Sequence, residues 1–358
     1  MKSRLGFCTF GMFIIDEIDY GDGKVESTII GGGGLYAALG ARLASGEANA
    51  RAVSCIVDKG SDFPQEFQAL IETWGTSCIF RTDLGRLTTR AWNGYGPIQH
   101  RAFKYVTLKR RLEVESLTDE QALAATFHMV CSPSRCMSLV NGLWERRKAL
   151  HASEPRPIII WEPIPDLCTP AEVDNLREAA KFVNVISPNG GELADFFASG
   201  LQELSRRDMV ASLLKKCGDN AKQVVVVREG AEGSRLYTQG KVLHLRAYHL
   251  DPSRVLDPTG GGNTFLGGLA MGLSGMVNPD FKDMSTGLGL VAETCPSQTT
   301  SMLTAVVHAT VAASYAIEQV GVPRLDPSDR ESWNGQSYIE RFHAYLGRER
   351  PHIVDQLD

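Results

Sequence analysis

Short apolar runs alternate with helical stretches along most of this 358-residue chain, and this alternation constrains the fold more than any other feature. Runs typical of buried parallel strands lie at residues 127–131, 158–161, 183–186 and 224–227. Stretches typical of helices separate them, at residues 139–150, 171–181 and 207–217. The pattern predicts an α/β fold with a doubly wound, mostly parallel sheet and helices on both faces. Ligands bind to such sheets beyond the carboxyl ends of the strands.

Residues 88–105 depart from this rhythm. Two β-like arms flank the sequence Gly-Tyr-Gly-Pro at residues 94–97. This predicts a hairpin that projects from the core as a small β lid. Arg90 and Arg101 lie in its arms. Pairing of the lid with that of a second copy would give a homodimer, but its short polar arms do not decide this.

The composition excludes several classes of protein. Apolar residues make up 43% and charged residues 22%, as in ordinary globular chains. The net charge of -5 gives no reason to expect nucleic acid as a partner. No apolar run approaches the roughly 20 residues that a membrane span needs. The eight cysteines are scattered without a CxxC pair, which argues against zinc. We therefore expect a cytoplasmic protein with reduced thiols and no membrane contact.

The last part of the chain differs from the rest in composition. Residues after 325 are mostly polar, with one weakly helical stretch at residues 338–346. We expect residues 1–325 to form the α/β domain and residues 326–358 to form a polar C-terminal tail.

Three consecutive glycines, Gly260, Gly261 and Gly262, follow a strand-like segment and precede a helical one. Backbone N–H groups of such a run converge at the positive end of the helix and form an anion hole. This suits a phosphate or a developing negative charge. Asn263 closes the run, and its amide cannot accept a proton at neutral pH. Asn263 could equally be the N-cap of the helix, without a chemical role.

Three further motifs fall at the ends of expected strands. Four glycines at residues 31–34 open an alanine-rich helical stretch, although they could serve only a tight turn with close packing. Asn189 and Glu192 have the spacing of a polar site, but also that of a helix-capping pair. The sequence Arg-Glu-Gly-Ala-Glu-Gly-Ser at residues 228–234 predicts a turn after a buried strand.

Taken in their order along the chain, these four motifs resemble those of the ribokinase/PfkB family of sugar and nucleoside kinases across roughly residues 5–321. Pro258 and the sequence Gly-Gly-Gly-Asn at residues 260–263 are most similar to those of an atypical fungal branch, the maintenance-of-killer type. The resemblance implies a ribokinase-like fold and phosphoryl transfer from ATP, with Mg²⁺, to a small-molecule acceptor.

The resemblance also implies a role for each matching position. The three glycines would form the anion hole around the transferring phosphoryl group, with Asn263 at the position of the catalytic base. Residues implied on the nucleotide side are Asn189, Glu192, Arg228, Gly230, Gly233 and Asp257, with Glu192 near the metal. Residues implied on the acceptor side are Asp16, Gly32, Gly33, Tyr36, Arg90 and Arg101.

Four positions depart from the family pattern. Asn263 replaces the catalytic aspartate, Leu35 or Tyr36 replaces a substrate-binding asparagine, Arg228 replaces a small hydroxyl residue and Glu162 replaces an aspartate. Loss of a general base typically costs about 10²–10⁴-fold in rate.

Three hypotheses therefore stand. The chain is an active phosphotransferase, in which Asp16 or Asp257 acts as the base or the acceptor is a carboxylate that needs none. Alternatively it is a pseudokinase that binds a nucleotide or metabolite, or an interaction protein that keeps only the fold.

Overall fold

A seven-stranded sheet forms the centre of the computed structural model, which describes residues 4–95, 101–198, 204–214, 223–238, 240–289 and 298–357. The strand order is β1-β8-β9-β10-β11-β12-β13. The first five are parallel: β1 (Phe7–Thr9), β8 (Thr126–Cys131), β9 (Ile158–Pro163), β10 (Val185–Ile186) and β11 (Val224–Arg228). The last two, β12 (Ser234–Tyr237) and β13 (Val242–Leu245), are antiparallel. The four apolar runs correspond to β8–β11, so the predicted parallel sheet is confirmed.

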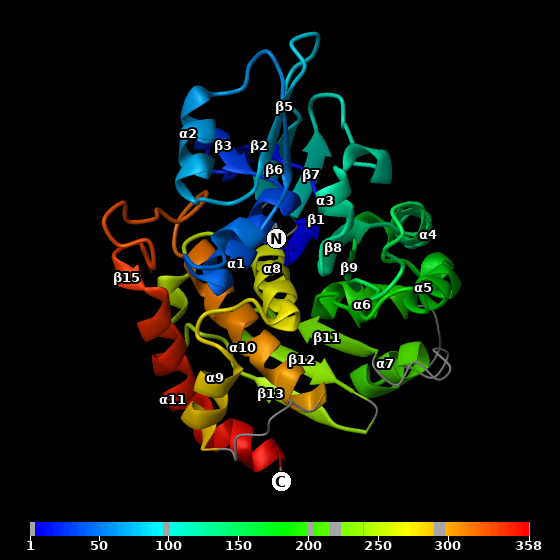
Figure 1. Cartoon of the computed structure of the whole chain (residues 1–358), viewed down its shortest axis with the longest axis vertical. Coiled ribbons are helices and arrows are strands. Elements are labelled where there is room, and N and C mark those ends of the chain that lie inside the picture. Colours follow the sequence, from blue (N-terminus) through cyan, green and yellow to red (C-terminus); the bar gives the residue numbers. More distant parts are fainter. Residues whose placement is uncertain are drawn as a thin grey trace.

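Both faces of the sheet are buried, because successive strand residues point to opposite sides. In β11, Val224 and Val226 belong to one apolar core, and Val225 and Val227 belong to the other. The first core contains side chains of α1 (Gly33–Ser45), α8 (Gly261–Ser274), α9 (Phe281–Leu288) and α10 (Gln298–Ala316). The second contains side chains of α4 (Pro133–Ala149), α5 (Val173–Ala180), α6 (Gly190–Phe196) and α7 (Arg206–Leu214). The predicted helices on both faces are therefore confirmed (Figure 1).

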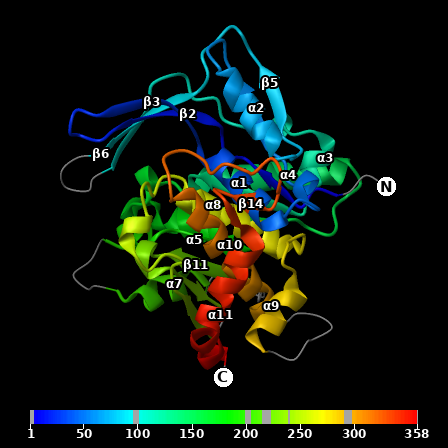
Figure 2. The same cartoon turned by 90° about the vertical axis from the view of Figure 1, so that its left-hand side faces the viewer.

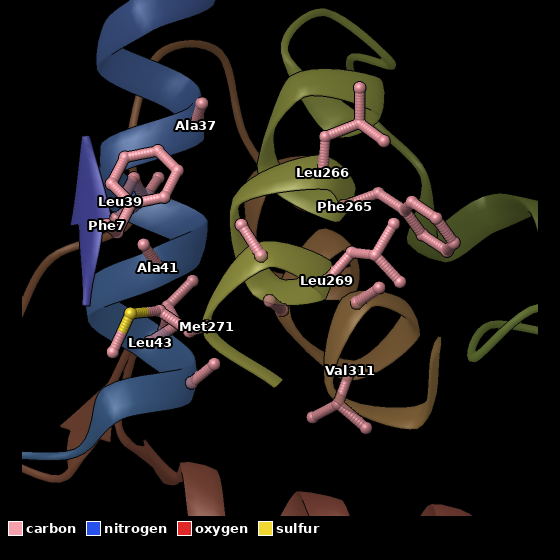
Figure 3. Close-up of a cluster of buried hydrophobic side chains, with 14 of the residues drawn as sticks. Phe7, Ala37, Leu39, Ala41, Leu43, Phe265, Leu266, Leu269, Met271 and Val311 are labelled. Atoms are coloured by element: carbon pink, nitrogen blue, oxygen red, sulfur yellow. The ribbon is translucent and has the colours of Figure 1, made fainter. Parts of the chain in front are cut away.

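Helices α1 and α8 pack unusually close together, with α10 beside α8 (Figure 3). A methyl carbon placed on Gly267 would lie 1.8 Å from the carbonyl oxygen of Ala37, and one placed on Gly40 would lie 1.9 Å from that of Thr264. Only glycine permits this approach. The glycines within these helices thus fix the position of α8, whose first turn carries the glycine run.

The lid is a four-stranded sheet with the order β3-β2-β6-β7. The predicted hairpin is confirmed as the antiparallel pair β6 (Arg90–Tyr95) and β7 (Arg101–Tyr105). Two further lid strands, β2 (Ile14–Asp19) and β3 (Val25–Gly31), were not predicted from the sequence. Figures 1 and 2 show the lid at one end of the molecule, beyond the main sheet. Nearby lie α2 (Gln65–Thr73), α3 (Asp119–Ala122), and the parallel pair β4 (Ile56–Lys59) and β5 (Ile79–Thr82).

The C-terminal region corrects the prediction of a polar tail with a weak helix. After the short strands β14 (Ser332–Trp333) and β15 (Gln336–Ser337), α11 runs over Tyr338–Leu357. Its buried apolar residues, Tyr338, Phe342, Tyr345, Leu346 and Ile353, belong to the first core. They share one face of a helix that is otherwise polar, so the polar composition of the segment did not indicate that this face is buried. Among the described residues, no helix combines the length and apolarity needed to cross a membrane.

Candidate functional site

The glycine run forms a sharp entry into α8. Gly260 is the N-cap residue and has φ 79°, in the left-handed region that favours glycine. The carboxylate of Asp257 accepts a hydrogen bond from the backbone N–H of Thr259 at 2.9 Å, which stabilises the preceding turn. A methyl carbon placed on Gly261 would lie 2.6 Å from Cγ2 of Ile317. Packing therefore requires glycine here.

The guanidinium group of Arg228 lies against the first turn of α8. A methyl carbon placed on Gly262 would lie 2.2 Å from Nη1 of Arg228. Nη2 of Arg228 lies 2.7 Å from Oε1 of Glu162 and 3.4 Å from Oε2 of Glu192. It also donates to the carbonyl oxygen of Ser187 at 2.9 Å. A cation held by two carboxylates thus stands beside the predicted anion hole.

Asn263 is paired with a carboxylate from a neighbouring strand. Its Nδ2 donates to Oε2 of Glu162, at the end of β9, over 2.6 Å. The same oxygen lies 3.7 Å from Nε2 of His128 on β8, whose Nδ1 lies 2.9 Å from the hydroxyl of Thr9 on β1. Three adjacent strands and α8 therefore contribute to one polar network. Asn263 is not the N-cap of α8, because Gly260 occupies that position.

The two carboxyl groups beside Arg228 have opposite pKa shifts. Burial disfavours ionisation of Glu162, but Arg228 and then His128 outweigh it and lower the pKa of Glu162. Burial raises the pKa of Glu192 to about 7, with the negative charge of Glu162 adding to the effect and Arg228 opposing it. The site thus contains one firmly ionised carboxylate and one that titrates near neutral pH.

The pair Asn189 and Glu192 forms a capping box at the start of α6. Oδ1 of Asn189 accepts from the backbone N–H of Glu192 at 2.8 Å, and Oε2 of Glu192 accepts from that of Asn189 at 2.7 Å. The capping interpretation is confirmed. Within the described ranges, no cluster of three or more His, Cys, Asp or Glu side chains could hold a metal.

A pocket of about 500 Å³ opens between α6 and the turn after β11. Its lining combines predicted nucleotide-side residues with three arginines; it consists of Asn189, Gly190, Gly191, Arg206, Arg228, Glu229, Gly230, Glu232 and Arg235. A methyl carbon placed on Gly230 would meet nothing within 4 Å, whereas one on Gly233 would lie 2.1 Å from a carbonyl oxygen of β13. Gly230 therefore faces open space, and Gly233 serves backbone packing.

The buried carboxylate of Glu229 orients two of the arginines in this pocket. Oε1 pairs with Arg206 of α7 and Oε2 pairs with Arg235 of β12. The side chain of Glu229 is 5% exposed, so a buried carboxylate holds both guanidinium groups in place. The sequence analysis did not identify Arg206 or Arg235, since both lie outside the quoted motifs, although Arg235 directly follows the motif at residues 228–234.

On the acceptor side, the structure brings Asp16 close to Asn93, and Gly33 close to Asn263. Oδ1 of Asp16 accepts from Nδ2 of Asn93 at 3.0 Å. A methyl carbon placed on Gly33 would lie 3.2 Å from Nδ2 of Asn263. The alternation of β6 could have identified Asn93, because it shares the buried face with Ala91.

The other predicted acceptor residues have structural partners. Gly32 packs against the backbone around Met12, and the buried ring of Tyr36 lies against Gly260 while its hydroxyl donates to the carbonyl oxygen of Gly321 at 3.2 Å. Nε of Arg90 pairs with Asp62 at 2.7 Å. The side chain of Arg101 lies outside the described residues.

Comparison with known proteins agrees with this architecture. The family model for pfkB family carbohydrate kinases matches residues 162–322. The structure of ribokinase from Giardia lamblia superimposes with a TM-score of 0.65 at 16% identity, covering 99% of this chain and 100% of that chain. An E. coli structure of a ribokinase II in complex with ATP and Mg²⁺ superimposes with a TM-score of 0.62 at 17% identity, covering 97% and 100% of the two chains.

The chain belongs to the pfkB family of carbohydrate kinases and has the ribokinase-like fold. Within this family it is similar to Protein MAK32 of Saccharomyces cerevisiae, with 33% identity over 362 residues that span 95% of this chain and 92% of that protein. The expected similarity to the maintenance-of-killer branch of fungi is therefore confirmed.

Proposed function

We propose that this chain is an ATP-dependent phosphotransferase that acts on a small-molecule acceptor. The observation that carries the proposal is the position of the arginine-lined pocket, which shares Arg228 with the start of α8 and the pair formed by Asn263 and Glu162. A phosphate chain in this pocket would end beside the glycine run, where backbone N–H groups favour negative charge.

The residues present fit a phosphate chain. Arginine side chains bind phosphate oxygens through several donors at once. Nε of Arg228 is buried and has no hydrogen-bond partner among the described residues, so the guanidinium group is not fully satisfied by the protein. Gly190 and Gly191 leave the side of the pocket formed by α6 free of side chains.

The same residues fit Mg²⁺ together with phosphate, but not Mg²⁺ alone. Mg²⁺ is usually held by one or two carboxylates with water and substrate phosphates. Glu192 would supply a carboxylate, and it now contacts Arg228. When bound, the ion would neutralise charge on the phosphates. An ionised Glu192 requires a nearby cation, and Arg228 or the metal would provide it.

The nature of the acceptor belongs to the proposal. The carboxylate of Asp16, supported by Asn93, suits a hydroxyl-bearing acceptor, and the ring of Tyr36 is buried and cannot reach it. Arg90 is paired with Asp62, which weakens the argument for a carboxylate acceptor. An alcohol acceptor is therefore the better match. Strands β3 and β7 lie at the edges of the lid sheet, and a homodimer formed through the lid stays a prediction. Light scattering of the purified chain would test it.

One observation favours a second candidate, a nucleotide-binding pseudokinase. Arg228 lies at the start of α8 and its charge is already compensated by two carboxylates. If it keeps this position when the nucleotide binds, the phosphate chain would bind without reacting. Binding of Mg·ATP without release of ADP in the presence of any acceptor would distinguish this candidate.

Calorimetric titration of the chain with Mg·ATP tests the proposal, with Gly191→Glu and Gly191→Gln as a matched pair. A methyl carbon placed on Gly191 would meet only Oδ1 of Asn189, at 3.3 Å, so both side chains can be accommodated. The glutamate places a negative charge in the pocket and should weaken binding at least about tenfold, which corresponds to about 1.4 kcal/mol. The glutamine has the same size but no charge, so it should weaken binding less than the glutamate does. Equal affinity for both variants, or no binding at all, would contradict the proposal.

A further inference from the structure

The carboxylate that position 263 lacks is present one hydrogen bond away. Glu162 approaches the start of α8 from β9, and its Oε2 lies 2.6 Å from Nδ2 of Asn263. Of the two groups in this contact, the amide comes from the helix and the carboxylate from the strand. The site has therefore not lost its negative charge, which lies on the neighbouring element.

Contacts on three sides hold the carboxylate of Glu162 in place. Nη2 of Arg228 binds Oε1 at 2.7 Å, Asn263 donates to Oε2, and the buried ring of His128 lies behind, with Nε2 at 3.7 Å. The distance to His128 exceeds that of a hydrogen bond, so one lone pair of Oε2 remains for another donor. The side chain of Glu162 is 9% exposed, which leaves a narrow approach.

Two glycines adjoin this pair. A methyl carbon on Gly262 would lie 3.8 Å from Oε1 of Glu162 and 2.2 Å from Nη1 of Arg228, which also lines the phosphate pocket. One on Gly33 would lie 3.2 Å from Nδ2 of Asn263, on the acceptor side. The pair formed by Glu162 and Asn263 thus lies between the pocket for the phosphate donor and the region of the acceptor.

The two other carboxylates considered as bases are less well placed. Oδ1 of Asp257 accepts from the backbone N–H of Thr259 within the turn before α8. Asp16 lies in the lid, with Oδ1 accepting from Asn93. The carboxylate to which Asn263 donates is that of Glu162, at 2.6 Å.

We propose that Glu162 is the catalytic carboxylate of this site and takes the proton of the acceptor in place of residue 263. This inference rests on the proposed function. In the step, the hydroxyl oxygen of the acceptor forms a bond to the γ-phosphorus of ATP. The bond from that phosphorus to the β,γ-bridging oxygen breaks, and ADP leaves with its electron pair. The hydroxyl proton passes to Oε2 of Glu162.

In this arrangement Asn263 is a positioning residue. Its Nδ2 holds Oε2 of Glu162, and its Oδ1 remains to accept a hydrogen bond from the acceptor. Arg228 keeps Glu162 ionised until the proton arrives. The low pKa of Glu162 ensures that the carboxylate is present throughout the neutral range.

A charge-exchange experiment tests the inference with three variants: Glu162→Gln, Asn263→Asp and the double variant. Release of ADP from Mg·ATP is measured with ribose and with acetate as acceptors, alongside calorimetric binding of Mg·ATP and thermal unfolding. Glu162→Gln should retain nucleotide binding within a few-fold and lose about 10²–10⁴-fold in kcat. Glu178→Gln, on the exposed part of α5, is the matched control and should behave as the wild type does.

The other two variants give a readout that a merely structural role of Glu162 would not produce. Asn263→Asp places two carboxylates at the 2.6 Å contact and should lower the Tm. The double variant restores one amide and one carboxylate in exchanged positions. It should regain the Tm and recover part of the turnover with ribose, since a carboxylate again adjoins the acceptor.

The outcomes separate this inference from the proposed function. Absence of Mg·ATP binding in the wild type overturns both. Binding with turnover that Glu162→Gln leaves unchanged overturns only the role of Glu162. Binding without turnover in the wild type, together with turnover in the double variant, shows that Glu162 cannot replace an acid at position 263 and supports the pseudokinase. Binding without turnover in either also overturns the inference.

Discussion

Arg341 and Arg228 both contact carboxylates, and they differ in how fully their hydrogen-bond donors are satisfied. Arg341 on α11 lies in the core and donates from each of its three nitrogens to Glu318, Gln336 or Ser314. Its guanidinium carbon also lies 3.6 Å from the centre of the Tyr315 ring. One cation meets one carboxylate, and the described contacts leave no donor of Arg341 unused.

Around Arg228, by contrast, two carboxylates face one cation. They are Glu162 and Glu192, and the buried Nε of Arg228 has no hydrogen-bond partner among the described residues. Burial raises the pKa of Glu192 to about 7, whereas the pKa of Glu318 is lowered because His249 and Arg341 outweigh its burial. An electrostatic surplus of this kind is costly for stability and is typical of functional sites. The comparison indicates that the cluster at Arg228 is arranged for a ligand.

The largest expected difference concerns removal of each cation. Arg341→Met should lower the free energy of unfolding by about 3–5 kcal/mol, because the buried Arg341 is removed from its contacts and the partly buried Glu318 keeps fewer partners. Arg228→Met should cost only about 1–3 kcal/mol at pH 7, since Glu192 can take up a proton and the site is already poorly satisfied. Urea denaturation of both variants measures the two losses. Equal losses of unfolding free energy in the two variants would contradict the difference between Arg341 and Arg228.

The next largest expected difference is in how the free energy of unfolding depends on pH. The pKa of Glu192 is raised from 4.5 to about 7 in the folded state, so its contribution to stability is present below pH 4.5 and is lost as the pH rises to about 7. Glu192→Gln should remove this loss and should be more stable than the wild type above pH 7 by about 1–3 kcal/mol, less any cost to the capping box. Urea denaturation at pH 5 and pH 8 measures it.

Glu318→Gln provides the contrasting control. The pKa of Glu318 is lowered, so its contribution is present above its ordinary pKa and is lost as the pH falls through the lower folded-state value. This variant should be less stable than the wild type at pH 8, and the difference should narrow only in acid. If both variants shift stability in the same direction at pH 8, the assignment of Glu192 as the surplus carboxylate is wrong.

Periodicity was sufficient to predict the central sheet and its helices, because burial on both faces dictates continuous apolar strands such as β11. It failed at α11, where Tyr338, Phe342 and Tyr345 form one apolar face within a polar segment. It also did not predict β2, since an apolar run does not reveal where a chain leaves one sheet for another.

The candidate site was predictable in its positions but not in its pairings. The motifs identified Asn263, Arg228 and Glu192, because glycines and polar residues at strand ends carry a local signal. The contact between Asn263 and Glu162 joins residues 101 positions apart and depends on the long side chain of Glu162. Such contacts follow from the crossing of α8 over β9, which no local pattern records.

The smallest expected effect concerns the contact between Arg228 and α8. Gly262→Ala adds a carbon that would lie 2.2 Å from Nη1 of Arg228, so the end of this flexible side chain must move. The free energy of unfolding should fall by up to about 1 kcal/mol, because part of the strain is offset by the helix propensity of alanine. Gly347→Ala in α11 is the matched control: the added carbon meets nothing within 4 Å, and the variant should gain about 0.5–1 kcal/mol. If both variants are stabilised equally in urea denaturation, Arg228 does not rest on the first turn of α8, and the surplus of charge there must be compensated in another way.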